Sequence, residues 1–207
     1  MAEPAVRPSY SPTAADAAPA RRWRTVDIVV TAVLGVAFGV VFWARNLLWA
    51  ATGAAFAAFP PAQAFMYGVW LLPAVVAPLI VRRAGAGLFA EFIAAVVSAL
   101  LGSAWGAQVL LYGLLQGLAG EAGYAVFRYR RYGWPQALLS AVLAGAMAAA
   151  LDLYYWYPTW AGNWKLTYVI VVIASTVIVS GLGGRALVQA LARTGALSSF
   201  VSGRSRV

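Results

Sequence analysis

SAWGAQVLLYGLLQGLAGE, the stretch covering residues 103–121, is apolar enough to cross a bilayer, yet it carries Trp105, Gln108, Tyr112 and Gln116. At about 100° per residue, these four side chains fall within roughly 80° of one another on a helix. An unpaired amide in hydrocarbon costs on the order of several kcal/mol. We therefore expect the stripe to face other helices or a cavity, and we interpret it as the lining of a solute pocket.

Composition indicates that the chain is an integral membrane protein. Of its 207 residues, 63% are hydrophobic and 10% are charged, and the mean hydropathy is +0.78. Soluble domains are only about half apolar and a quarter charged. Cys and His are absent, which excludes thiol nucleophiles, Cys/His metal sites and a Ser-His-Asp triad. We expect a transport or binding protein with no catalytic residue, metal or cofactor.

The apolar residues form six runs, each predicted to be a transmembrane helix. About 20 residues match a hydrocarbon core of roughly 30 Å. Residues 45–61 are expected to be a connector, since Gly53 and Pro60-Pro61 argue against a full span, although the Ala-rich middle allows a short helix or re-entrant segment. The runs are Thr25 to about Ala44, Ala62–Val81, about Gly87 to Ser103, residues 103–127, Pro135–Tyr155 and about Leu166 to Leu187.

Basic residues set the orientation of these helices. The net charge is +9, but the basic residues form short clusters between apolar runs, so nucleic acid is not an expected partner. The positive-inside rule then predicts an all-α bundle of six transmembrane helices in the plasma membrane, with both termini cytoplasmic. The clusters are Arg21, Arg22 and Arg24, then Arg82 and Arg83, then Arg128, Arg130 and Arg131, then Arg193, Arg204 and Arg206, whereas the alternate connectors carry only Arg45 and Lys165.

This topology predicts a simple domain organisation. Residues 1–22, rich in Ala, Pro and Ser, are expected to be a disordered cytoplasmic tail. Residues 23–192 form the six-helix transmembrane domain, and residues 193–207 form a cytoplasmic C-terminal tail.

Orientation also gathers polar and aromatic side chains in the outer half of the bundle. Such a cluster predicts an outward-open pocket with a few directional groups on aromatic walls. The alternative for each amide is a hydrogen bond to a neighbouring helix, and for Asp152 a place in the interfacial loop. An acidic side chain beside aromatic faces favours a cation. The candidate solute-binding residues are Asn46, Gln63, Tyr67, Trp70, Trp105, Gln108, Tyr112, Gln116, Asp152, Tyr155 and Trp156.

Other polar and small residues lie outside this stripe. Glu91 and Glu121 are at an inner depth, where we interpret them as structural or partner-facing. Ala32, Gly35 and Gly39 give the first helix small faces that allow close approach of another helix, either within the chain or from a partner. A P-loop for ATP is absent from the sequence.

Several segments together resemble a known family. WRTVDIVVTAVLGVAFGVVFWA, PAQAFMYGVWLLPAVVAPLIVRR, LLGSAWG and LLYGLLQGLAGEAGYAVFRYRR are similar to the YkoE-type substrate-binding (S) components of energy-coupling factor (ECF) transporters. The resemblance covers about Arg22 to Leu191. It implies a six-helix protein that binds thiamine or its hydroxymethylpyrimidine precursor from outside, in contact with membrane lipid.

The resemblance also implies protein partners. These are a transmembrane coupling protein and cytoplasmic ABC ATPases, so ATP hydrolysis would be the work of other subunits. Docking of the coupling protein on the first helix would map to Ala32, Gly35 and Gly39. The alternative function is a stand-alone secondary carrier or channel for a small organic solute. A membrane enzyme is disfavoured because the chain has neither a nucleophile-base pair nor a metal cluster.

Overall fold

The computed structural model describes residues 22–204, and every regular element among them is helical. The expected N-terminal tail, apart from Arg22, and residues 205–207 lie outside the described part. The elements in order are α1 (Thr25–Thr52), η2 (Gly53–Phe56), η3 (Pro60–Leu71), α2 (Leu72–Val81), α3 (Ala86–Leu100), α4 (Gln108–Ala125), α5 (Trp134–Tyr155), α6 (Gly162–Thr176), η4 (Val177–Gly183), α7 (Gly184–Arg193) and α8 (Val201–Arg204).

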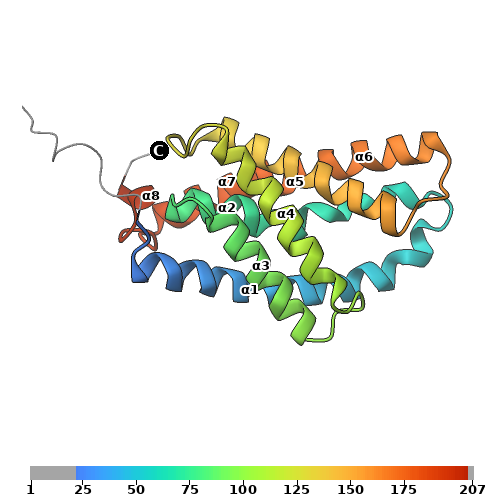
Figure 1. Cartoon of the computed structure of the whole chain (residues 1–207), viewed down its shortest axis with the longest axis horizontal. Coiled ribbons are helices and arrows are strands. Elements are labelled where there is room, and N and C mark those ends of the chain that lie inside the picture. The colour runs from blue at the N-terminus through green and yellow to red at the C-terminus, as the bar shows by residue number, and fades with distance from the viewer. Residues whose placement is uncertain (1–21, 205–207) are drawn as a thin grey trace, which may run out of the picture.

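Within residues 22–204 these elements form six antiparallel helical rods, because η2 continues α1, α2 continues η3, and α6, η4 and α7 run on as one rod. Four rods are long and apolar enough to cross a membrane, namely Thr25–Phe56, Pro60–Val81, Trp134–Tyr155 and Gly162–Arg193, and α3 is a shorter apolar helix. The start of α1 and the short helix α8 lie at the same end of the bundle (Figure 1). The predicted all-α, six-helix class is therefore confirmed.

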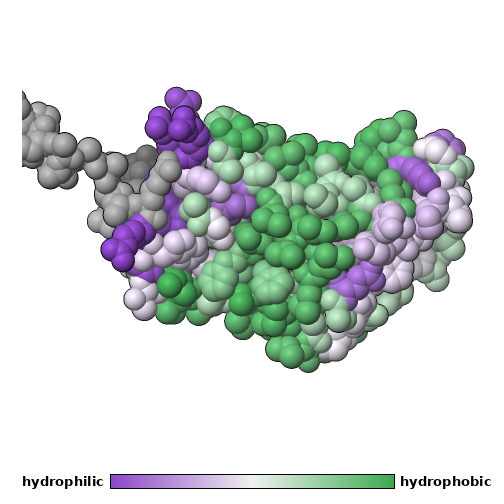
Figure 2. All heavy atoms as spheres, in the orientation of Figure 1, coloured by the Kyte–Doolittle hydropathy of each residue, from purple (hydrophilic) through white to green (hydrophobic). Residues whose placement is uncertain are grey.

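The surface has the layering of a membrane protein. In the view of Figure 2, an apolar band covers the middle of the molecule, and the most polar residues lie at the end that holds α8 and, more sparsely, at the opposite end. The end with α8 carries the arginine clusters near Arg24, Arg83, Arg130 and Arg193. By the positive-inside rule this arginine-rich end faces the cytoplasm.

The first helix is longer than predicted. Residues 45–52, expected in a connector, continue α1, which runs for 28 residues and is therefore about 42 Å long. Asn46, a polar residue of this last part, is satisfied by the Ser98 and Ser103 hydroxyls, each 3.2 Å from its Nδ2. The helix loosens into the short 3₁₀ turn η2 at Gly53, where the sequence placed its breaker.

The fourth helix begins later than predicted. It starts at Gln108, and residues 101–107 form a turn in which Gly102 and Gly106 have φ angles of 86° and 56°. Left-handed backbone of this kind suits glycine, which has no Cβ to clash. Trp105 therefore belongs to the turn before α4 and not to its helical face.

Small residues bring α1 and α3 together inside the chain. A Cβ on Gly35 would lie 2.7 Å from the Ile93 Cβ, and one on Gly39 would lie 2.5 Å from the Val97 Cβ. Both glycines are buried, whereas Ala32 is partly exposed. The contact expected for a partner at Gly35 and Gly39 is thus occupied by this chain's own third helix.

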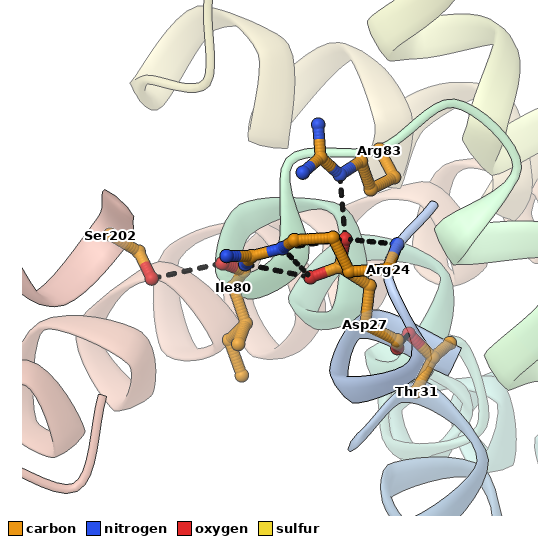
Figure 3. A network of polar contacts seen from close by, with 6 residues as sticks. All are labelled: Arg24, Asp27, Thr31, Ile80, Arg83 and Ser202. Carbon is orange, nitrogen blue, oxygen red and sulfur yellow. Dashed lines mark hydrogen bonds and ion pairs between the residues drawn. The ribbon is translucent and has the colours of Figure 1, made fainter. Parts of the chain in front are cut away.

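The arginine-rich end is closed by a polar network around Asp27 (Figure 3). The fully buried Asp27 carboxylate accepts hydrogen bonds from the Arg24 backbone N–H at 3.0 Å and from the Arg83 Nε at 2.8 Å. A further 2.9 Å ion pair joins it to the Arg24 Nη2, and this hydrogen bond raises the pKa of Arg24. Asp27 therefore ties the start of α1 to the loop between α2 and α3.

The C-terminal segment also belongs to this end of the bundle. After α7 the chain turns back, and Leu197 and Phe200 are buried in the core cluster that contains Ile80 and Tyr124. The Ser202 hydroxyl donates a 2.9 Å hydrogen bond to the Ile80 carbonyl (Figure 3). The part of the predicted tail that the structure describes is thus packed onto α2.

The two inner glutamates cap helices other than their own. The Glu121 carboxylate on α4 accepts from the backbone N–H groups of Gly85 at 2.7 Å and Gly87 at 2.8 Å, at the start of α3. Glu91 on α3 accepts from the Ala74 N–H at 3.1 Å, in the first turn of α2. A carboxylate at a helix N-terminus satisfies unpaired donors and complements the helix dipole.

Candidate functional site

A cavity of about 300 Å³ lies in the half of the bundle away from the arginine clusters. It is bounded by the second half of α1, η3, α3, the turn before α4, the start of α4 and the end of α5. Its lining reaches the surface at Trp156, which is 47% exposed. The lining residues are Phe42, Asn46, Trp49, Tyr67, Trp70, Glu91, Ala95, Ser98, Trp105, Gln108, Val109, Tyr112, Gly113, Gln116, Asp152, Trp156 and Tyr157.

The structure brings together all the predicted solute-binding residues except Gln63 and Tyr155. Trp105 lines the cavity from the turn before α4, and Gln108, Tyr112 and Gln116 line it from one face of that helix. The stripe is neither turned outward nor sealed against its neighbours. The role of these side chains as solute ligands stays a prediction.

Gln63 lies on a different face of its helix from Tyr67 and Trp70, because that helix is not an α-helix. Their i, i+4, i+7 spacing makes one face of an α-helix, but η3 is a 3₁₀ helix, which turns by about 120° per residue. Gln63 is therefore rotated by about a third of a turn from the other two. Its Nε2 instead donates a 2.7 Å hydrogen bond to the Trp49 carbonyl, which joins η3 to α1.

Tyr155 lies behind the cavity wall. It is 44% exposed, and its ring is 6.4 Å from that of Tyr112, which does line the cavity. The Tyr112 hydroxyl accepts a 3.0 Å hydrogen bond from the Trp156 indole. Tyr155 thus supports the lining side chain Tyr112 from outside.

Aromatic rings form the walls. Trp70 is central, because its ring lies 5.3 Å from Trp49, 5.2 Å from Tyr67 and 5.7 Å from Trp105, measured between centroids. Its indole N–H donates to the Asn46 Oδ1 at 3.1 Å. The Asn46 side-chain amide is therefore hydrogen-bonded to protein groups, and it fixes the orientation of Trp70.

The lining carries acidic side chains and, among the described residues that form it, no basic ones. Asp152 on α5 is 7% exposed and accepts a hydrogen bond from the Tyr168 hydroxyl. The hydroxyls of Tyr67 and Tyr112 also interact with this carboxylate. Glu91 is 1% exposed and contributes the second carboxyl. Such a cavity favours a cationic or hydrogen-bond-donating guest.

Sequence reasoning missed several lining residues. Glu91 was assigned to the inner half by depth, although an acidic residue inside a transmembrane helix is a functional candidate by default. Trp49 was not among the predicted solute-binding residues, although it lines the cavity. Tyr157, just after α5, lines the cavity but was not among the predicted residues, and its burial raises its pKa to about 12. Within residues 22–204, no three His, Cys, Asp or Glu side chains gather in a metal-binding group.

Comparisons with known proteins agree with this architecture. The family described as "ABC-type cobalt transport system, permease component" matches residues 26–147. The "Putative HMP/thiamine permease protein YkoE" of Bacillus subtilis (strain 168) is 30% identical over 187 residues, 89% of this chain and 92% of that protein. A crystal structure of "an S-component of ECF transporter" superposes with a TM-score of 0.84 at 29% identity, covering 88% of this chain and 92% of that one.

Fold and cavity together define a multi-pass membrane protein of the S-component class, a transport subunit and not an enzyme. The chain belongs to the YkoE-like S components of ECF transporters. As a component of an ABC-type system it works with energising partner subunits, which sets aside the stand-alone carrier or channel.

Proposed function

We propose that this chain captures thiamine or its hydroxymethylpyrimidine precursor from outside the cell and delivers it for ATP-driven uptake. The observation that carries the proposal is the cavity itself, with its tryptophan and tyrosine walls and its acidic lining. Aromatic faces stack on a flat heteroaromatic ring, and the side-chain amides Gln108 and Gln116 suit ring nitrogens and an amino group. The name of the Bacillus relative supports the same solute class.

Of the two solutes, thiamine fits better. Its thiazolium ring carries a permanent positive charge, whereas the pyrimidine alcohol is neutral at physiological pH. Asp152 and the surrounding rings offer a cation both an opposite charge and π-faces. The proposal therefore assigns the thiazolium to the Asp152 side of the cavity.

The partners in this proposal are a transmembrane coupling protein and cytoplasmic ABC ATPases, with α1 as the docking helix. Because Gly35 and Gly39 pack on α3, docking would use the outward face of α1 next to Ala32. That face exposes Val29, Val33 and other aliphatic side chains.

Calorimetry on the purified protein in detergent tests the solute. We expect thiamine to bind, and Asp152→Asn to weaken thiamine by about ten-fold or more while affecting the neutral pyrimidine less, as expected for loss of a partly desolvated charge contact. Tyr154→Phe is the matched control, since Tyr154 is 74% exposed and outside the lining. Absence of binding for both solutes would refute the proposal.

A further inference from the structure

The wall segment η3 has an unusual helix type for its length. It runs for 12 residues as a 3₁₀ helix, although such helices rarely exceed about 3–4 residues. Residues three apart eclipse in a 3₁₀ helix, so Tyr67 and Trp70 stand one above the other on the cavity wall, with ring centroids 5.2 Å apart. In an α-helix, residues three apart diverge by about 60°. The cavity wall therefore depends on the 3₁₀ geometry.

Two serines on the neighbouring rod bind the backbone at Gly68, directly between these two aromatic residues. The Ser175 Oγ accepts a 2.9 Å hydrogen bond from the Gly68 N–H and donates one of 2.5 Å to the Phe65 carbonyl. It thus bridges the two groups that an i→i−3 bond would join. The Ser180 hydroxyl donates to the Gly68 carbonyl. We call Ser175 and Ser180 the serine clamp.

Close approach of the two rods makes the clamp possible. A Cβ on Gly68 would lie 2.5 Å from the Ser175 carbonyl oxygen and 2.6 Å from the Val179 Cβ. Ser180 belongs to the π-helical segment η4. In an α-helix, residues five apart are separated by about 140°, and the wider turns of a π-helix reduce that separation. Ser175 at the end of α6 and Ser180 in η4 therefore contact the same glycine.

We propose that Ser175 and Ser180 are positioning residues of the solute site, which hold η3 in its 3₁₀ form and so align Tyr67 and Trp70. Without the two hydroxyls, the buried N–H and C=O of Gly68 lose their partners, a loss that a backbone in a membrane offsets by forming i→i−4 bonds. That change rotates Trp70 away from Tyr67. The inference rests on the proposed function, because it concerns the same cavity.

The experiment compares Ser175→Ala and Ser180→Ala with Ser140→Ala in full-length protein. Ser140 is an informative control, because its hydroxyl is equally buried but has no hydrogen-bond partner within residues 22–204. We measure thiamine affinity and the 19F spectrum of 5-fluorotryptophan-labelled protein without solute, with the Trp70 resonance assigned from Trp70→Phe. Both clamp variants should bind thiamine about five-fold or more weakly, since a buried backbone group is left unpaired, and should shift the Trp70 resonance.

The control and a rescue variant separate positioning from general stability. Ser140→Ala should leave affinity and spectrum unchanged, and Ser180→Thr, which keeps a hydroxyl, should return both toward the wild type. A clamp variant that melts earlier yet keeps its affinity and its Trp70 resonance overturns the proposal. If Ser175→Ala does not fold, Ser180→Ala alone decides. Wild-type protein that binds neither thiamine nor the hydroxymethylpyrimidine precursor refutes the proposed function, while the Trp70 resonance still tests the clamp.

Discussion

Each acidic side chain in residues 22–204 is at most 7% exposed, and each is paired with a particular donor. Asp27 meets arginines, Glu91 and Glu121 meet backbone N–H groups, and Asp152 meets a tyrosine hydroxyl. Burying a charge without such a partner is costly. For a single residue, what matters is whether its polar group is already hydrogen-bonded within the protein or is left without a partner and can bind a solute.

Gln108 and Asn46 differ in this respect. Within residues 22–204 the Gln108 side-chain amide has no hydrogen bond to the protein although it lines the cavity, whereas the Asn46 amide has three. We expect Gln108→Ala to weaken thiamine binding by about 1–3 kcal/mol, because a solute group loses its partner. Calorimetry checks this, with Gln189→Ala on α7 as a control far from the cavity. Equal affinities for the two variants would contradict a ligand role for Gln108.

The sequence predicted most of the lining because polar residues in a lipid-facing environment are expensive, and depth could be read from the arginine clusters. Gln63 lies outside the lining, because its predicted place on one face with Tyr67 and Trp70 assumed an α-helical period and the segment is a 3₁₀ helix. Glu91 was missed because its carboxylate has two roles: it lines the cavity and also accepts a hydrogen bond from the Ala74 N–H in the first turn of α2. Neither helix type nor a cap from another helix can be derived from residue spacing alone.

At the scale of elements, α3 depends on a carboxylate from α4. Its start at Gly85 has no side-chain cap of its own, and Glu121 occupies the amides instead. We expect Glu121→Ala to lower the free energy of unfolding by about 1–3 kcal/mol or more, the cost of unsatisfied buried donors. Glu121→Gln keeps an acceptor oxygen and should lose less. Thermal unfolding in detergent measures both, and equal stability of the alanine variant and wild type would disprove the capping role.

The α1–α3 contact leads to a second expectation at this scale. Gly39→Leu should destabilise the chain itself, because any Cβ there lies 2.5 Å from Val97 and 2.9 Å from the Ala94 carbonyl oxygen. Val36→Leu, on the exposed side of α1 at 48% exposure, should be tolerated. The yield of monodisperse protein and its melting temperature compare the two. A well-folded Gly39→Leu protein would reopen the possibility that this face meets a partner.

Element boundaries were harder to predict than elements. Apolar length and flanking arginines predicted all six rods, but the extension of α1 to Thr52 and the late start of α4 at Gln108 differ from expectation. The extension of α1 depends on tertiary contacts, whereas the late start of α4 follows from the left-handed backbone of Gly102 and Gly106 in the preceding turn. Asn46 is satisfied by serines at the end of α3 and in the next turn, so α1 continues through it.

At the scale of the whole molecule, the orientation can be tested directly because the native chain has no cysteine. Ala84, between α2 and α3, and Thr159, between α5 and α6, are both exposed. In intact cells a membrane-impermeant maleimide should label Thr159→Cys and leave Ala84→Cys unlabelled until the membrane is opened. The reverse pattern would invert the topology derived from the arginines.

The charge of the cavity has a consequence for which forms of the proposed solute a cell could take up. Its charged lining is acidic only, and like charges repel strongly where water is scarce. Under the proposed function, phosphate esters of the solute would therefore bind poorly beside Asp152 and become usable only after hydrolysis outside the cell. Conversely, phosphorylation by a cytoplasmic kinase would trap the imported molecule, because the esterified form could not return through the same cavity.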